Sequence, residues 1–341
     1  MPPPPFSLAD AEWLAHRYVE GADRVRFIHV PRERHAQVPF LTDDCLGNPG
    51  QSHELAAAEC LARAQRGPLH FLFHSAFCGS TLLARAFDRP GWAMTLSEPM
   101  LFNDVVGFRR RGASPSAVAR LADCALRLTA RPFAAGEAVM VKPSNVINPL
   151  AELLLALSPD SRAVFLYAPL ETFLLSVARK GLQCRLWARE LAEGYLTDGM
   201  LAPLGLGLPE VLRQTDLQAA ASCWLAQHRQ FALLAAKFGS ERIATLDSEA
   251  MMAEPARAVA AAAGHFGLPL AAAEAAEIAA GPAFSRHSKS GETYSADARR
   301  EDYAAARTAY GEEIGMVVAW TKKLAEAANV ALDPPGRLVQ P

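Results

Sequence analysis

The chain has 341 residues, 51% of them hydrophobic, a composition typical of a folded globular protein with a sizeable core. The formal net charge of -2 argues against a nucleic-acid partner held by bulk charge. The six cysteines are scattered, without a CxxC pair or a metal-ligand cluster, a pattern typical of unpaired thiols in a reducing compartment.

The N-terminal segment "MPPPPFSLADAEW" has neither the basic region nor the apolar region of a secretory signal. The longest apolar runs are rich in alanine and too short to span a bilayer. We therefore expect a soluble cytoplasmic protein without a membrane partner. Nothing in the sequence indicates its oligomeric state.

Residues 1–66 are predicted to form an N-terminal extension that packs on the core. A helix is expected over residues 9–18. The segment "RVRFIHV" (residues 24–30) alternates polar and apolar residues, as a half-buried strand does. The segment "LTDDCLGNPGQS" is expected to be a loop, followed by a helix over residues 53–64.

From residue 67 to about residue 300, strands and helices are expected to alternate. The strand segments are "LHFLFH", "WAMTL", "AVMVK", "RAVFLYA" and "ERIATLD". This alternation predicts an α/β fold, a three-layer sandwich around a mainly parallel sheet of about five strands. Residues 185–215, with many glycines and prolines, are expected to form a helical insertion or lid. Residues 301–341 are expected to form a C-terminal helix and tail.

Chain crossovers in a parallel sheet bring the loops after its strands to one edge. We therefore expect the segments that follow the first four strands to share one crevice. They are residues 74–81, 97–100, 142–145 and 168–170.

The first of these segments contains "HSAFCGST", a candidate phosphate-binding loop. A strand, a short loop and a helix opened by Gly79, Ser80 and Thr81 can direct backbone N–H groups and the helix dipole at an anion. The ATP-binding pattern G-x-x-x-x-G-K-[ST] is not met, because His74 replaces its first glycine and Ser80 its lysine. The ordinary alternative is a tight turn capped by Ser80.

Two further polar residues end strands at the same edge. Glu98 in "LSEP" suits a general base, although a surface or helix-capping glutamate would also explain it. Lys142 in "VKPSNVIN" can replace the missing loop cation as a flexible point charge, or it can be an ordinary surface lysine.

Basic residues mark two later segments. Ser176, Arg179 and Lys180 share one helix face, which suits a second phosphate or a basic helix end that answers the helix dipole. Arg286 and Lys289 in "FSRHSKSGETYS" could close over a nucleotide or belong to a solvated loop. The arginines at 299 and 300 are expected to be solvated.

Together these motifs resemble the sulfotransferase family of the P-loop superfamily, particularly its bacterial branch, over residues 68–300. Two departures stand out, because the family commonly has a loop lysine at the position of Phe77 and a phosphate-binding arginine at that of Ala168. The matching segments, in family order, are "HSAFCGSTLLAR", the Glu-Pro at 98–99, the Lys-Pro-Ser at 142–144, "LSPDSRAVFLYAPLETFLLSVARK" and "ERIATLDSEAMMAEPARAVAAAAGHFGLPL".

The resemblance implies a P-loop-type fold and a transferase. The donor would be 3′-phosphoadenosine 5′-phosphosulfate, and a small molecule would accept the sulfuryl group on a hydroxyl or amine. Sulfuryl transfer, like phosphoryl transfer, passes through a loose in-line transition state. The protein's task is therefore mainly positioning and charge stabilisation, with no metal required.

The resemblance also implies roles for particular residues. Glu98 or His74 would deprotonate the acceptor, and Lys142 would stabilise charge on the bridging oxygen. The implied donor-binding residues are Ser75, Phe77, Cys78, Gly79, Ser80 and Thr81 for the phosphosulfate, and Ser176 and Arg179 for the 3′-phosphate, with Lys180, Arg286 and Lys289 compensating for the two lost cations.

Two alternatives remain open at this point. One is a non-catalytic P-loop protein that binds a nucleotide or a partner, which the departures at Phe77 and Ala168 favour. The other is an atypical kinase. It would need a magnesium-binding acid after a strand, and Asp247 is the candidate.

Overall fold

The structure is a computed structural model that describes residues 4–47, 50–285 and 296–340. The chain divides into two compact units. The first unit comprises Met1–Phe73 and Thr81–Ala163, and the second comprises His74–Ser80 and Val164–Pro341.

The predicted α/β class is confirmed by a five-stranded sheet with the strand order β5-β6-β4-β7-β8. β4 pairs with β6, and β6 pairs with β5, in parallel. Every strand is short and mostly apolar, and each lies at the apolar sequence segment that predicted it. The bounds are β4 Leu69–His74, β5 Ala93–Ser97, β6 Ala138–Lys142, β7 Ala163–Tyr167 and β8 Ile243–Asp247.

The N-terminal part of the first unit forms its own antiparallel sheet in the order β1-β2-β3. Its strands are β1 Trp13–Val19, β2 Arg24–His29 and β3 Ser52–Ala56. The helix expected over residues 9–18 is wrong, because β1 pairs with β2 along its length. The helix expected from residue 53 begins only at Ala57, because residues 52–56 pair with β2.

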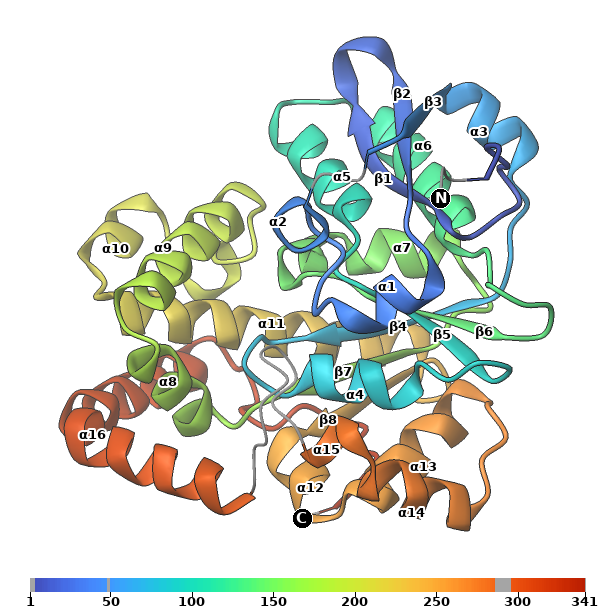
Figure 1. Cartoon of the computed structure of the whole chain (residues 1–341). Helices are drawn as coiled ribbons and strands as arrows, with labels where there is room; N and C mark the ends of the chain where they lie inside the picture. Colours follow the sequence, from blue (N-terminus) through green and yellow to red (C-terminus); the bar gives the residue numbers. More distant parts are fainter. Residues whose placement is uncertain (1–3, 48–49, 286–295, 341) are drawn as a thin grey trace. The chain divides into compact units, whose positions relative to one another are not determined.

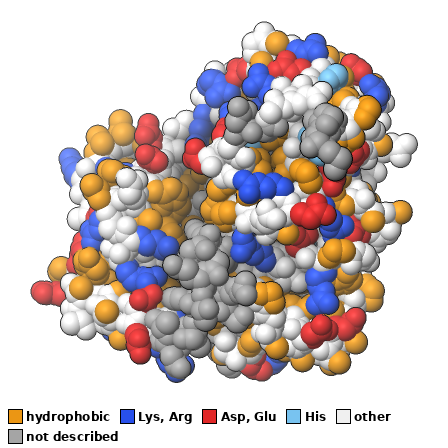
Figure 2. All heavy atoms as spheres, in the orientation of Figure 1, with side chains coloured by type: hydrophobic (Ala, Val, Ile, Leu, Met, Phe, Trp, Pro, Cys, Tyr) orange, Lys and Arg blue, Asp and Glu red, His pale blue; other side chains and the backbone are white. Residues whose placement is uncertain are grey.

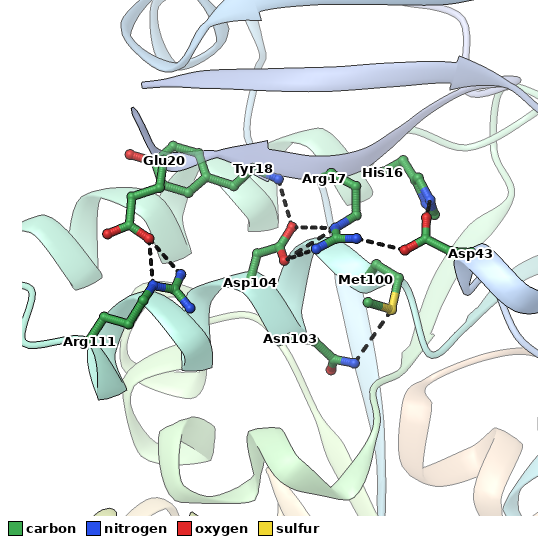
Figure 3. Close-up of polar contacts among 9 residues, drawn as sticks. All are labelled: His16, Arg17, Tyr18, Glu20, Asp43, Met100, Asn103, Asp104 and Arg111. Carbon is green, nitrogen blue, oxygen red and sulfur yellow. Dashed lines mark hydrogen bonds and ion pairs between the residues drawn. The ribbon is translucent and has the colours of Figure 1, made fainter. Parts of the chain in front are cut away.

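Polar contacts with α5 (Met100–Arg110) and α2 (Asp43–Leu46) hold β1 in place (Figure 3). Arg17 Nε donates to Asp104 Oδ2 at 3.0 Å and its Nη1 to Asp43 Oδ2 at 2.6 Å. The backbone N–H of Tyr18 also donates to Asp104, at 2.7 Å. Because Asp104 binds both the side chain of one strand residue and the backbone of the next, these bonds stabilise the strand rather than a helix.

The other elements of the first unit surround β1, β4, β5 and β6. Figure 1 shows α5 and α6 close to β1, and contacts join both helices to that strand. α4 begins at Ser80, directly after the candidate loop. The bounds are η1 Glu20–Ala22, α1 Arg32–Gln37, α3 Ala57–Arg63, α4 Ser80–Phe87, α6 Pro115–Thr129, η2 Asn145–Leu150 and α7 Ala151–Leu157.

The second unit is mostly helical beyond β7 and β8. In Figure 1, α8 and α11 lie beside α9 and α16, and contacts join α8 to each of the other three. The expected insertion at 185–215 contains most of α9, then η3 and α10. The bounds are α8 Leu170–Arg179, α9 Leu182–Thr197, η3 Ala202–Leu204, α10 Leu208–Arg213, α11 Asp216–Phe238, α12 Ser248–Ala253, α13 Pro255–Phe266, α14 Ala272–Ala280, α15 Pro282–Ser285 and α16 Ala296–Ala327.

The C-terminal tail and a group of exposed hydrophobic side chains are two further features of the second unit. The tail after α16 returns to β8, where Thr245 N donates to Gly336 O at 2.8 Å. Figure 2 shows hydrophobic side chains gathered over α9 and α10, whose Leu182 and Leu212 are 70% and 65% exposed.

Candidate anion-binding site

The loop between β4 and α4 has an unusual backbone and leads directly into a helix. Ala76, Phe77 and Gly79 all have left-handed φ angles, of 70°, 51° and 79°. Loops that include left-handed residues can turn successive N–H groups toward one concavity, and the first N–H groups of a following helix have no partner within the helix. Glycine is favoured at position 79, because its φ of 79° strains other residues and a Cβ there would lie 3.0 Å from Met251 Cε.

His74 and Ser75 fix the shape of this loop. His74 Nδ1 accepts a hydrogen bond from Ala76 N at 3.0 Å. The Ser75 hydroxyl donates to Ala76 O at 3.2 Å and accepts from Ala168 N at 3.3 Å. The loop is therefore tied to the end of β7 by a buried serine whose hydroxyl already donates within the fold.

Phe77 stands where the resembled family has a lysine, and it packs on α8. Its ring centroid is 6.0 Å from that of Phe173 and 5.2 Å from that of Trp187 in α9. Lys180 Nζ lies 5.5 Å from the Phe77 ring centroid, within cation–π range. The loop thus carries no cation of its own, but Lys180, directly after α8, supplies one beside it.

Ser176 lies on the helix face that contacts the loop. Phe173, Ser176 and Lys180 are three and four residues apart, so they line one side of α8. Phe77 contacts the first and the last of these residues. The loop and the predicted second phosphate site are therefore neighbours within the second unit, about 10 Å apart or less along the helix axis.

Residues of α16 meet this face of α8, a contact that no sequence motif indicated. Ser176 Oγ and Tyr303 OH are 2.9 Å apart, and Arg179 forms an ion pair with Asp302. Arg299 was expected to be solvated, which is wrong. Its side chain is only 20% exposed and pairs with Glu249, and its Cζ lies 5.1 Å from the Tyr303 ring centroid.

Ala168, at the position of the family arginine, is fully buried. Its backbone O accepts a hydrogen bond from Trp224 Nε1 of α11 at 2.9 Å, while its N–H donates to Ser75. An arginine side chain would have to enter this packed core. The cation lost at this position is therefore not replaced there, and among the residues that the structure describes the candidates to compensate for it lie on or next to α8 and α16.

Glu98 and Lys142 meet in the first unit. The parallel register places Ser97 opposite Lys142, and Glu98 N donates to Lys142 O at 2.6 Å. The fully buried Lys142 ammonium forms an ion pair with Glu98 and lies 4.8 Å from the Phe40 ring centroid. Glu98 has a left-handed φ of 52°, a strained form that costs about 1–3 kcal/mol and is frequent at functional sites.

The remaining predicted residues fall into two groups. Cys78, Ser80 and Thr81 are buried at the start of α4. Arg286 and Lys289 lie outside the described residues.

The loop belongs to the second unit and the Glu98–Lys142 pair to the first. The roles of all these residues stay predictions.

The candidate magnesium ligand of a kinase has a structural role. Asp247 caps α12, where its Oδ1 accepts from Glu249 N at 2.7 Å. Burial raises the pKa of its carboxyl group. Across residues 4–47, 50–285 and 296–340, no group of three or more His, Cys, Asp or Glu residues is placed to hold a metal ion.

Comparison with solved structures returned sulfotransferases, the family that the motifs resemble. The domain from the curacin biosynthetic pathway is 14% identical, with a TM-score of 0.43 over 79% of this chain and 100% of its own. The domain from the Synechococcus PCC 7002 olefin synthase is 13% identical, with a TM-score of 0.40. The match covers 79% of this chain and 98% of that domain. STF9 from Mycobacterium avium is 14% identical, with a TM-score of 0.40. The match covers 74% of this chain and 79% of STF9.

Likeness at this level does not extend to activity, substrate or site residues. No family model matches the chain, and no curated protein matches it. Within the part of the chain that the structure describes, no helix is both long enough and apolar enough to cross a membrane.

Proposed function

We propose that the chain is a sulfotransferase-like enzyme that uses 3′-phosphoadenosine 5′-phosphosulfate. One observation carries this proposal: the candidate loop packs through Phe77 on the face of α8 that bears Ser176. A donor with phosphate groups at both ends of its ribose needs two adjacent anion sites. The loop and this face of α8 are adjacent in the same unit.

In this proposal the loop holds the 5′-phosphosulfate through backbone N–H groups and the hydroxyls of Ser80 and Thr81. Lys180 takes the place of the family's loop lysine, and the Phe77 ring positions its ammonium. Ser176 and Arg179 bind the 3′-phosphate. Each charge-assisted hydrogen bond of this kind contributes about 1.5–3 kcal/mol.

The chemical step is an in-line displacement at sulfur. An acceptor hydroxyl or amine attacks the sulfur atom, the bond from sulfur to the 5′-phosphate oxygen breaks, and adenosine 3′,5′-bisphosphate leaves. Glu98 takes the proton of the acceptor, and Lys142 stabilises the negative charge that develops on the bridging oxygen. The strained backbone of Glu98 supports a functional role for this pair.

His74 fits the role of base less well than Glu98. Its Nδ1 already accepts the Ala76 N–H, so a proton could bind there only if this loop hydrogen bond broke. His74 is 5% exposed. Its geometry favours a part in shaping the loop.

Two observations bear on the alternatives. The cation beside Phe77 weakens the argument that the missing lysine makes the loop a non-catalytic remnant. The capping role of Asp247 leaves the kinase without its candidate ligand. The sulfotransferase-like function therefore agrees best with the geometry.

A thermal-shift panel tests the proposal. Adenosine 3′,5′-bisphosphate without metal should raise the unfolding midpoint, because a ligand at 100 times its Kd stabilises the native state by about 2.7 kcal/mol. ATP with magnesium should raise it much less. A shift with ATP and magnesium alone would favour the kinase, and no shift with either ligand would favour a non-catalytic protein that binds a partner rather than a nucleotide.

A further inference from the structure

Three residues of α16 lie at the predicted 3′-phosphate site on α8. Tyr303 OH is 2.9 Å from Ser176 Oγ, and Ser176 is 3% exposed. Asp302 forms an ion pair with Arg179. Arg179 and Arg299 have their Cζ atoms 5.9 Å and 5.1 Å from the Tyr303 ring centroid.

This cluster has more hydrogen-bond donors than its own acceptors use. A bond between two hydroxyl groups uses only one of their two protons, so the Ser176–Tyr303 pair keeps one to donate. Arg179 Nε is buried and has no hydrogen-bond partner among the described residues. A buried donor without an acceptor is costly, which marks this as a place for a further anion.

Each arginine of the cluster is paired with a carboxylate, and a phosphate could take the place of such a carboxylate. Arg179 is paired with Asp302, and Arg299 with Glu249. A carboxylate offers a guanidinium the same kind of planar acceptor as two phosphate oxygens. The carboxylate of Asp302, a residue of the same chain, therefore binds Arg179 in the way that a phosphate monoester would.

We propose that Tyr303 and Arg299 of α16 complete the 3′-phosphate site and that Asp302 occupies it in the absence of donor. This inference rests on the proposed function. When the donor binds, its 3′-phosphate displaces Asp302 from Arg179 and accepts hydrogen bonds from Arg179, Ser176 and Tyr303. Arg299 supplies a second positive charge, in place of the one lost at Ala168.

The test is calorimetry on the full chain without metal, with adenosine 3′,5′-bisphosphate and adenosine 5′-phosphate as probes. Tyr303→Phe keeps the ring near both arginines and removes the hydroxyl. It should weaken binding of the bisphosphate about 10-fold and leave the monophosphate unchanged. Asp302→Asn removes the internal competitor, so it should strengthen bisphosphate binding several-fold, again without effect on the monophosphate.

A matched control uses another contact between the same two helices. Glu171 of α8 accepts from Arg307 Nε of α16 at 2.9 Å, and both side chains are more than half exposed. Glu171→Gln should leave both affinities unchanged, whereas a misfolded variant would lose both. The monophosphate thus serves as an internal reference for folding.

The outcomes separate this inference from the proposed function. If the wild-type chain binds the two probes equally, the proposed function fails, and the inference fails with it. If the wild-type chain prefers the bisphosphate but Tyr303→Phe and Asp302→Asn leave that preference unchanged, only the inference is overturned. Weaker bisphosphate binding by Asp302→Asn would also overturn it.

Discussion

At the scale of single residues, Lys180 brings a positive charge beside the candidate loop. Lys180 directly follows α8, 103 positions after Phe77, and the fold sets its ammonium 5.5 Å from the Phe77 ring centroid. Gly79 and Ser176 were proposed from local geometry and family spacing, and their roles stay predictions. The contacts of Tyr303 and Asp302 with α8 could not be predicted, because they arise from long-range packing.

Lys180→Met should weaken binding of adenosine 5′-phosphate about 10-fold, because the charge beside the loop is lost. Phe77→Lys in the same chain should restore much of that affinity by returning a cation to the loop. Lys237 provides the control, since its Nζ lies 5.8 Å from the ring centroid of Phe238 elsewhere in the second unit. Calorimetry in which Lys180→Met and Lys237→Met behave alike would contradict this role.

Glu98→Gln tests the acceptor base. The substitution keeps the shape of the side chain and removes the proton acceptor. The rate of sulfuryl transfer should fall about 10²–10⁴-fold, with little change in the affinity for the donor. If steady-state kinetics show a rate within a few-fold of wild type, the proton goes to another group.

At the scale of elements, the errors in the N-terminal part have a common cause. The segment at residues 9–18 contains Ala, Glu and Leu, good helix formers whose intrinsic preference is worth only about 0.7 kcal/mol or less per residue. Pairing with β2 and the contacts of Asp104 outweigh this preference. The later strands could be predicted because their apolar runs are short and bounded by turns.

Asp104→Ala should destabilise the chain by about 1.5–3 kcal/mol. It removes a carboxylate that is hydrogen-bonded to both Arg17 and the backbone of Tyr18. The exposed pair of Arg63 and Glu59 is a suitable control, and Glu59→Gln should cost about 0.5 kcal/mol or less. Equal shifts of the denaturation midpoint in the two variants would show that Asp104 does not stabilise β1.

At the scale of the whole molecule, buried histidines contribute to the response to acid. Burial lowers the pKa of His228 to about 3 and that of His35 to about 4. Between about pH 6.5 and these values, the unfolded chain binds protons that the folded chain does not. Stability therefore falls as the pH drops below about 6.5, by up to about 1.4 kcal/mol per pH unit for each histidine.

His228→Phe should flatten this dependence. The His228 ring stacks on Trp224, with centroids 3.5 Å apart, so phenylalanine keeps most of the packing. Chemical denaturation at pH 7 and pH 5 should show that the variant loses about 2 kcal/mol less than the wild-type chain between these pH values. Identical losses would mean that His228 is not the neutral, buried group described.

The α/β class follows from the alternation of apolar strands and amphipathic helices, and this level of organisation was predictable. The proposed function requires that two anion sites bind one donor. Calorimetry tests this directly, because it measures the affinity for each nucleotide. Without metal, adenosine 3′,5′-bisphosphate should bind the wild-type chain at least about 10-fold more tightly than adenosine 5′-phosphate, because its 3′-phosphate adds charge-assisted hydrogen bonds on α8. Equal affinities, or binding that requires magnesium, would contradict the sulfotransferase-like function.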